Sequence, residues 1–163
     1  MTRGMHQRRR RTRRGTTVVE TALVLPVYLM FVLGLIELGH ASMVQHVLNS
    51  ACRQASRMGS TTGNTTAMVK TKTLTVLGSA VKQNFVSVFV KDASVFDTGT
   101  PPTAGTSLEA MPNIELSSAP PRQLFMVRAS VNYKDIAIVP NIPILGKFLN
   151  GVVIQGQSFM RHE

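Results

Sequence analysis

Residues 13–36 read RRGTTVVETALVLPVYLMFVLGLI and pass from a block of arginines, through one glycine, into an apolar segment. The sixteen residues from Thr21 to Ile36 carry no charge, and residues 16–20 extend the segment to twenty-one. A helix of roughly 20 mainly apolar residues spans the hydrocarbon core of a bilayer. The stretch is therefore predicted to be a membrane-spanning helix.

The charges that flank this segment predict its orientation in the membrane. Seven arginines precede Gly15, whereas the thirty residues after the apolar run contain only Arg53 and Arg57 as basic residues besides histidine. Because positively charged flanks stay on the cytoplasmic side, the N-terminus is expected in the cytoplasm and the C-terminal body outside it. The expected divisions are a basic leader (1–15), the transmembrane half of a first helix (16–38) and an extracytoplasmic domain (39–163).

One acidic residue, Glu20, lies near the start of the apolar segment. A carboxylate inside a membrane helix costs roughly 2.5–3.5 kcal/mol on insertion scales, and such residues usually have a partner or a function. An ordinary membrane anchor has no use for this charge. Glu20 is therefore expected to have a functional role.

The residues around Gly15 resemble the class III signal of type IV pilins and pseudopilins, in particular the TadE-like minor pseudopilins of tight-adherence (Flp, type IVb) pili. The match consists of Gly15 before the cleavage position, Glu20 as the fifth residue after it, and the run VETALVLP at residues 19–26. The resemblance implies that a prepilin peptidase cleaves the bond between Gly15 and Thr16 at the cytoplasmic face. Glycine suits this position, because without a side chain it can lie close to the catalytic groups of a protease in an extended conformation.

The resemblance also implies a role for Glu20 in subunit assembly. Its carboxylate is expected to pair with the new N-terminal amine of Thr16 on a neighbouring subunit. Opposite charges attract strongly in a low dielectric, so the pair offsets two desolvation costs and sets the axial register of the subunits. Major pilins of this type usually have an aromatic residue directly after the glutamate, whereas this chain has Thr21. This difference favours a minor, initiating or assembly subunit.

Partners and location follow from the same resemblance. The implied partners are the prepilin peptidase, the major pilin, other pseudopilins, the inner-membrane assembly platform and membrane lipid. The implied location is the bacterial inner (cytoplasmic) membrane, crossed once, with the C-terminal domain periplasmic or within the pilus. The implied function is pilus initiation or assembly and surface adhesion, with no enzymatic activity and no cofactor.

Two other interpretations of the N-terminal region remain open. The first is an exported soluble protein with a secretory signal peptide, cleaved after Ala41 at the small-x-small triplet of residues 39–41. Against it, the apolar run is long for such a signal and contains Glu20, and Glu37 follows directly. The second is a simple single-pass anchor in which Glu20 is a tolerated interfacial charge.

The formal net charge of +10 at first suggests a nucleic-acid partner. Seven of the eighteen basic residues, however, precede residue 15, where membrane topology explains them. No aromatic residues lie among these arginines, as a single-strand binding surface requires. Nucleic-acid binding is therefore not expected.

The chain has one cysteine, Cys52, so it cannot form an internal disulfide. Cys52 lies within a helical stripe of apolar residues, which favours a packed thiol over the alternative of an intermolecular disulfide. The four histidines are scattered, and the spacing of six between His40 and His46 does not place them together on one helix face. No phosphate-binding glycine loop or nucleophile motif appears. Catalytic and metal-binding residues are therefore not predicted.

The rest of the chain is predicted to form one small α+β domain of the pilin-like type. The first helix is expected to continue to about Gly59, because apolar residues recur every three or four positions between 44 and 58. Pro26 is expected to kink it. A second helix is predicted over residues 66–82, with Asn64 or Thr65 as its cap.

Three strands are predicted at residues 85–91, 125–133 and 151–161, where valine, phenylalanine and tyrosine are frequent. They are expected to form an antiparallel sheet packed on the outer half of the first helix. Residues 98–122 are rich in proline, glycine, serine and threonine and are predicted to be a long surface loop. Residues 136–149 are expected to be a connection, because prolines and a glycine interrupt them.

Overall fold

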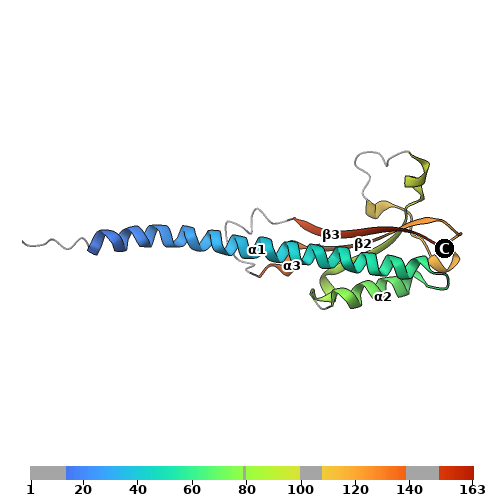
Figure 1. Cartoon of the computed structure of the whole chain (residues 1–163), viewed down its shortest axis with the longest axis horizontal. Coiled ribbons are helices and arrows are strands. Elements are labelled where there is room, and N and C mark those ends of the chain that lie inside the picture. Colours follow the sequence, from blue (N-terminus) through green and yellow to red (C-terminus); the bar gives the residue numbers. More distant parts are fainter. Residues whose placement is uncertain (1–13, 79, 100–107, 139–150) are drawn as a thin grey trace, which may run out of the picture. The chain divides into compact units, whose positions relative to one another are not determined.

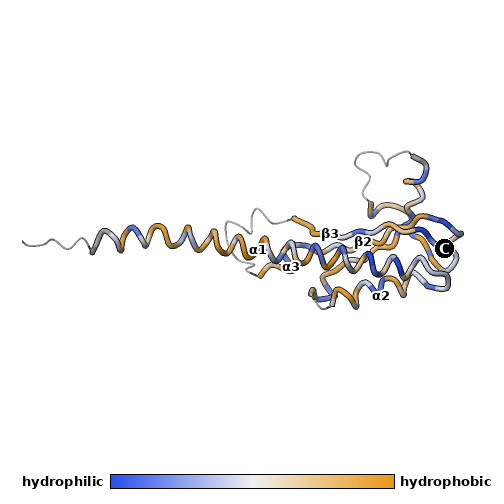
Figure 2. Tube along the Cα trace, viewed as in Figure 1, coloured by the Kyte–Doolittle hydropathy of each residue, from blue (hydrophilic) through white to orange (hydrophobic). Residues whose placement is uncertain are grey.

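The computed structural model of the chain describes residues 14–78, 80–99, 108–138 and 151–163. Its first element, α1, is a helix of 47 residues at Arg14–Ser60. The chain divides into two compact units, one ending at Ile36 and one beginning at Glu37, and each is described by itself. Figure 2 shows mainly apolar residues along the first part of α1 and a mixture of polar and apolar residues along the rest of it.

The second unit contains two layers, helices on one side and a sheet on the other (Figure 1). Its elements after α1 are α2 (Thr66–Leu77), β1 (Val86–Asp92), β2 (Leu124–Asn132), α3 (Tyr133–Ile136) and β3 (Val153–Arg161), with short 3-10 turns between them. The predicted α+β layout is therefore confirmed. The predicted strands match the observed ones within two residues at each end.

The sheet is antiparallel and has the strand order β1-β2-β3. Register places Val127 opposite Val90 on one side, and Ala129 opposite Gly156 on the other. Alternate residues of β2 face the helices, as the period of two in a strand requires. These inward residues, Phe125, Val127, Ala129 and Val131, are all buried.

The main core lies between the sheet and the second half of α1. The helix supplies a stripe of buried residues with helical spacing: Val44, Leu48, Ala51, Cys52 and Ala55. α2 adds Val69 and Leu77 to the same core. The opposite face of the sheet carries a smaller buried cluster of Ala93, Met111 and Met126. β2 is consequently buried on both faces.

α1 and β3 approach each other closely at Gly156. A Cβ built on Gly156 would lie 2.5 Å from the backbone carbon of Leu48, so only glycine fits there. Hydrogen bonds also join α1 and β3 at this interface. The Cys52 thiol donates to the Gly156 carbonyl at 3.3 Å, and the hydroxyls of Ser56 and Ser158 are 2.8 Å apart.

The N-terminus of α2 is held by its cap and by the segment that precedes β2. The Thr65 side chain accepts a hydrogen bond from the backbone amide of Met68, which confirms Thr65 as the cap. The Glu115 carboxylate accepts from the Thr66 amide at 3.0 Å, and this bond lowers the pKa of Glu115. The buried Thr66 hydroxyl donates to the Ile114 carbonyl at 2.8 Å.

α2 ends at Leu77, five residues before the predicted end at residue 82. Gly78 forms the C-cap, and the Gln83 side chain donates to the Leu74 carbonyl near the end of the helix. Gly78 keeps a right-handed helical conformation, and its amide donates to the same Leu74 carbonyl, so we attribute the end of the helix to the low helix propensity of glycine. Val81 is nevertheless buried in the core.

The two predicted connections lie partly outside the described residues. Within residues 98–122, the structure describes two 3-10 turns, Leu108–Ala110 and Leu116–Ser118, while residues 100–107 are not described. Of residues 136–149, only 136–138 are described, at and just after the end of α3.

Candidate functional site

The first half of α1 presents apolar side chains to its surroundings along its whole described length. Every residue from Thr17 to Phe31 is exposed; Val18, for example, is 68% exposed and Leu23 is 72% exposed. The most apolar window of the helix has a mean hydropathy of 2.2 and is 0% buried. Burying apolar surface gains about 25 cal/mol per Å². This segment therefore favours a lipid or protein environment, and α1 is long and apolar enough to cross a membrane.

Glu20 lies on this exposed helix surface. It borders a shallow hollow on one helix face, together with Thr17, Val24 and Tyr28. This spacing of three and four residues is that of neighbouring side chains on a helix. Within the part of the chain whose side chains are described, no cation forms an ion pair with the Glu20 carboxylate.

The other predicted site residues also lie in α1. Gly15 and Thr16 are in its first turn, and the helix continues through Pro26. The four first amides of a helix have no partner within that helix, so its first turn unwinds more readily than its middle. The kink at Pro26, the cleavage at Gly15 and the assembly role of Glu20 remain predictions.

The structure reveals a buried polar pair that was not predicted from the sequence. Glu37 is only 3% exposed, and its carboxylate accepts a hydrogen bond of 2.5 Å from the Tyr133 hydroxyl. Tyr133 begins α3, directly after β2. Burial, aided by the nearby Glu37 carboxylate, raises the pKa of Tyr133 to about 12. The two residues are 96 positions apart in the sequence. Sequence patterns within a single helix or strand cannot predict a contact over that distance.

Cys52 is a buried free thiol. Burial raises its pKa to about 11, while a backbone hydrogen bond at Ala129 acts in the opposite direction. A thiol with this environment is a poor nucleophile at neutral pH. The packing predicted for Cys52 is confirmed, and its burial argues against an intermolecular disulfide in the folded domain.

The histidines are not brought together. His46 is exposed on α1, whereas His162 is buried and neither of its ring nitrogens has a hydrogen-bond partner in the described structure. Among the described residues, no group of three or more histidine, cysteine, aspartate or glutamate side chains could hold a metal ion.

These features define a class of protein: one long N-terminal helix, apolar and exposed in its first half, whose second half forms the core of a small antiparallel α+β domain, as in pilin-like proteins. A family model described as "TadE-like protein" matches residues 15–57. The TadE-like resemblance of the N-terminal region is thereby confirmed over these residues, and it indicates a protein associated with tight-adherence pili. No match was found among curated proteins or among solved structures.

Proposed function

We propose that this chain is a minor pseudopilin or assembly protein of a tight-adherence pilus system, held in the bacterial inner membrane by the first half of α1. The observation that carries the proposal is the family match, which begins at Gly15 and includes the exposed Glu20 five residues later. The arginines before Gly15 keep the N-terminus in the cytoplasm, and the second unit lies on the other side of the membrane.

Processing precedes assembly. The prepilin peptidase cleaves between Gly15 and Thr16, which removes seven arginines and creates a new α-amine at Thr16. Because the bond lies in the first turn of α1, where helix amides lack partners, that turn can unwind into the extended form a protease needs. The new amine then pairs with Glu20 of a neighbouring subunit during pilus initiation, alongside the major pilin and other pseudopilins on the assembly platform. No catalytic role is proposed for this chain.

The buried pair of Glu37 and Tyr133 supports this proposal over a secretory signal peptide. Cleavage after Ala41 would remove Glu37, which is almost fully buried and hydrogen-bonded to Tyr133. It would also remove His40, which is partly buried. Cleavage after Gly15 keeps both residues within the mature protein.

The N-terminal residue of the mature protein tests the proposal. In cells that contain a prepilin peptidase, intact mass is expected to show the loss of residues 1–15, with Thr16 first. Gly15→Leu is expected to block this cleavage, whereas Gly4→Leu, a matched change within the leader, is expected to leave it intact. A mature chain that begins at Ser42 would establish a secretory signal, and an uncleaved chain in the presence of the peptidase would establish a simple anchor.

A further inference from the structure

The buried pair of Glu37 and Tyr133 marks one end of the second unit. The Tyr133 amide donates to the Val152 carbonyl at 2.9 Å, just before β3 begins. β1 starts at the same end, because Val86 is the register partner of Val131 near the end of β2. We call this region the Glu37 end. It comprises residues 37–38 of α1, residues 82–86 at the start of β1, residues 131–138 around α3, and residues 152–154 at the start of β3.

Exposed apolar side chains are concentrated at the Glu37 end. The structure describes nine large apolar residues of the second unit as exposed, and five of them lie at this end: Leu38, Phe85, Ile138, Val152 and Val153. The other four are spread over the rest of the unit: Met43, Met68, Val95 and Phe159. Single exposed apolar residues are ordinary on a protein surface, whereas a group of them at one place indicates a contact surface.

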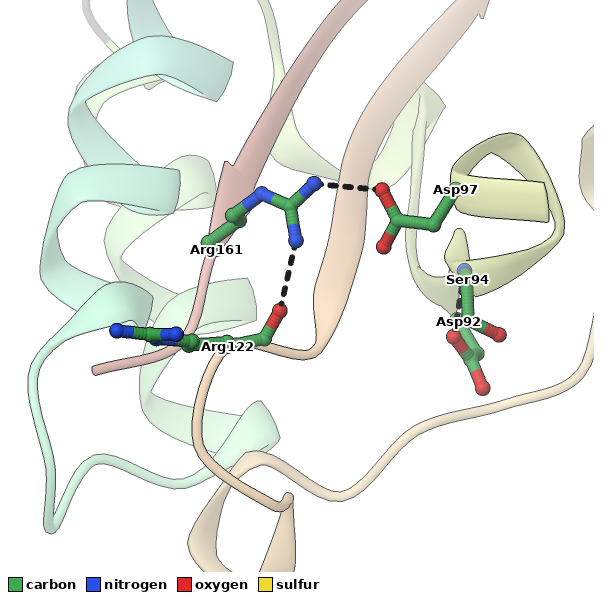
Figure 3. A network of polar contacts seen from close by, with 5 residues as sticks. All are labelled: Asp92, Ser94, Asp97, Arg122 and Arg161. Carbon is green, nitrogen blue, oxygen red and sulfur yellow. Dashed lines mark hydrogen bonds and ion pairs between the residues drawn. The ribbon is translucent and has the colours of Figure 1, made fainter. Parts of the chain in front are cut away.

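The opposite end of the sheet, where β3 ends, is polar instead. Arg161 donates to the Asp97 carboxylate at 2.6 Å and to the Arg122 carbonyl at 3.1 Å (Figure 3). The Asp92 carboxylate, at the end of β1, accepts from the Ser94 amide at 2.8 Å. Removing water from charged groups such as these is costly. The two ends of the sheet therefore favour different surroundings, and this one favours water.

The position of Glu37 in the chain indicates what the Glu37 end faces. Glu37 directly follows Ile36, which ends the run of sixteen uncharged residues in α1. A helix rises about 1.5 Å per residue, so Leu38 lies only about 3 Å along the axis from Ile36. The headgroup region adds roughly 5–7 Å to each side of the hydrocarbon core of a bilayer. When α1 crosses a bilayer, the lipid surface is therefore the nearest partner for this end.

Charged side chains limit how deeply the Glu37 end can enter the membrane. Lys82 and Lys134 are exposed there, and a lysine can lay its stem against apolar groups while its ammonium stays hydrated. Asp135 is also exposed, and a carboxylate is costly inside hydrocarbon. This mixture of apolar and charged side chains suits the headgroup region and not the hydrocarbon core.

We propose that the Glu37 end is a docking surface for the lipid bilayer, on which the second unit rests with Phe85, Ile138 and Val152 among the headgroups. The hydrogen bond between Tyr133 and Glu37 joins this surface to α1. The contact orients the second unit on the membrane before any partner protein binds. The inference rests on the membrane anchor that the proposed function includes, but it does not depend on cleavage or on a role in pili.

Quenching of fluorescence by labelled lipid tests the proposal. The chain has no tryptophan, so a single introduced tryptophan reports on one position. The full chain is held in nanodiscs whose phospholipids carry a nitroxide quencher either close to the headgroup or deep in the acyl chain. Val152→Trp reports on the Glu37 end. Val95→Trp is the matched control, because Val95 is also 41% exposed but lies just after the other end of β1.

Val152→Trp is expected to be quenched at least about threefold more than Val95→Trp, and more by the shallow label than by the deep one. Val27→Trp reports separately on the anchor, since Val27 is exposed in the apolar half of α1. It is expected to be quenched more by the deep label.

A second set of variants asks whether the apolar side chains carry the contact. In the Val152→Trp protein, Ile138→Ser with Val153→Ser is expected to reduce the quenching by about half or more, because less apolar surface is buried against lipid. The matched change, Met68→Ser with Val95→Ser, replaces two exposed apolar residues elsewhere in the unit. It is expected to leave the quenching unchanged.

Four results would overturn the proposal. Equal quenching of Val152→Trp and Val95→Trp, with Val27→Trp quenched, would show that the Glu37 end lies in water while the anchor stands. Protection of Val152→Trp from aqueous iodide without quenching by lipid would identify a protein contact, such as a second copy. Equal losses in the two serine variants would show that these apolar side chains do not make the contact. No quenching of Val27→Trp would remove the anchor itself, and with it that part of the proposed function.

Discussion

The contribution of one buried polar contact to the stability of the domain can be measured at the hydrogen bond between Tyr133 and Glu37. Tyr133→Phe removes the hydroxyl donor and keeps the ring, so the buried carboxylate loses this partner. Removing one partner of a buried hydrogen-bonded group costs about 1–3 kcal/mol, and we expect a loss of stability of that size. Urea unfolding of the full chain in nanodiscs, followed by circular dichroism, measures it. The chain's other tyrosine, Tyr28, is exposed on α1, so Tyr28→Phe is the control and should leave stability unchanged.

Because of Cys52, the stability of the domain is expected to fall as the pH rises in the alkaline range. Burial raises its pKa from 9.0 to about 11, so the folded protein keeps the neutral thiol while the unfolded chain ionises. This contribution is complete below about pH 9 and is lost as the pH rises through about 11, at no more than about 1.4 kcal/mol per pH unit. In reductant, the free energy of unfolding should fall between pH 9 and 10 in the natural protein and less steeply in Cys52→Ser. Identical slopes would contradict the assigned cause.

Single residues differ in how far the sequence alone could identify them. Gly15 and Glu20 stand out because their signal is local: a glycine between arginines and an apolar run, and a charge inside that run. The pairing of Glu37 with Tyr133 was not predicted, because it depends on where β2 ends relative to α1. A glutamate at the end of an apolar run was visible, but nothing near it in the sequence pointed to its partner.

The contact between α1 and β3 depends on the absence of a side chain at Gly156. Gly156→Ala places a methyl group 2.5–2.7 Å from backbone atoms of Leu48 and Asn49, which cannot move aside as a side chain could. We expect a loss of about 1–3 kcal/mol or more. The control is Gly39→Ala on α1, where no atom lies within 4 Å of the new methyl group and alanine favours the helix by up to about 1 kcal/mol. Thermal unfolding of the two variants should move in opposite directions.

Whole elements were predicted well where periodicity is strong. Repeats of three and four residues located the end of α1, and alternation located β2, because each pattern follows from the geometry of a single element. The extent of α2 was less accurate, since α2 ends at Gly78, a poor helix former, while apolar residues continue after it. Strand order was not predictable, because it depends on contacts between β1, β2 and β3 that are distant in the sequence.

At the scale of the whole molecule, the decisive question is whether Glu20 acts between subunits. Glu20→Ala removes an insertion cost from the membrane helix, so its abundance in the membrane should be at least normal. If Glu20 pairs with the N-terminal amine of a neighbour, assembly should fail, because breaking a buried ion pair costs about 3–5 kcal/mol. Glu20→Gln keeps the shape without the charge and should rescue little.

Pilus number and co-purification with the major pilin measure this effect, with membrane abundance as the control. Replacement of an exposed neutral neighbour, Thr17→Ala, serves as the matched variant and should leave piliation normal. Normal piliation in Glu20→Ala would mean that Glu20 is an incidental interfacial charge.

The change of surroundings along α1 has a consequence for how the protein can evolve. Apart from Glu20, the exposed side chains between Thr17 and Phe31 pack against no core of this chain, so leucine, isoleucine, valine and phenylalanine should be largely interchangeable there. From Val44 onward the same helix packs into a close-packed core. Gly156 contacts the helix backbone there, and a single added methyl group lowers the stability of the domain. Natural variants should therefore drift freely in composition along the first half of the helix. Along the second half, changes at one position should require compensating changes in the strands that pack against it.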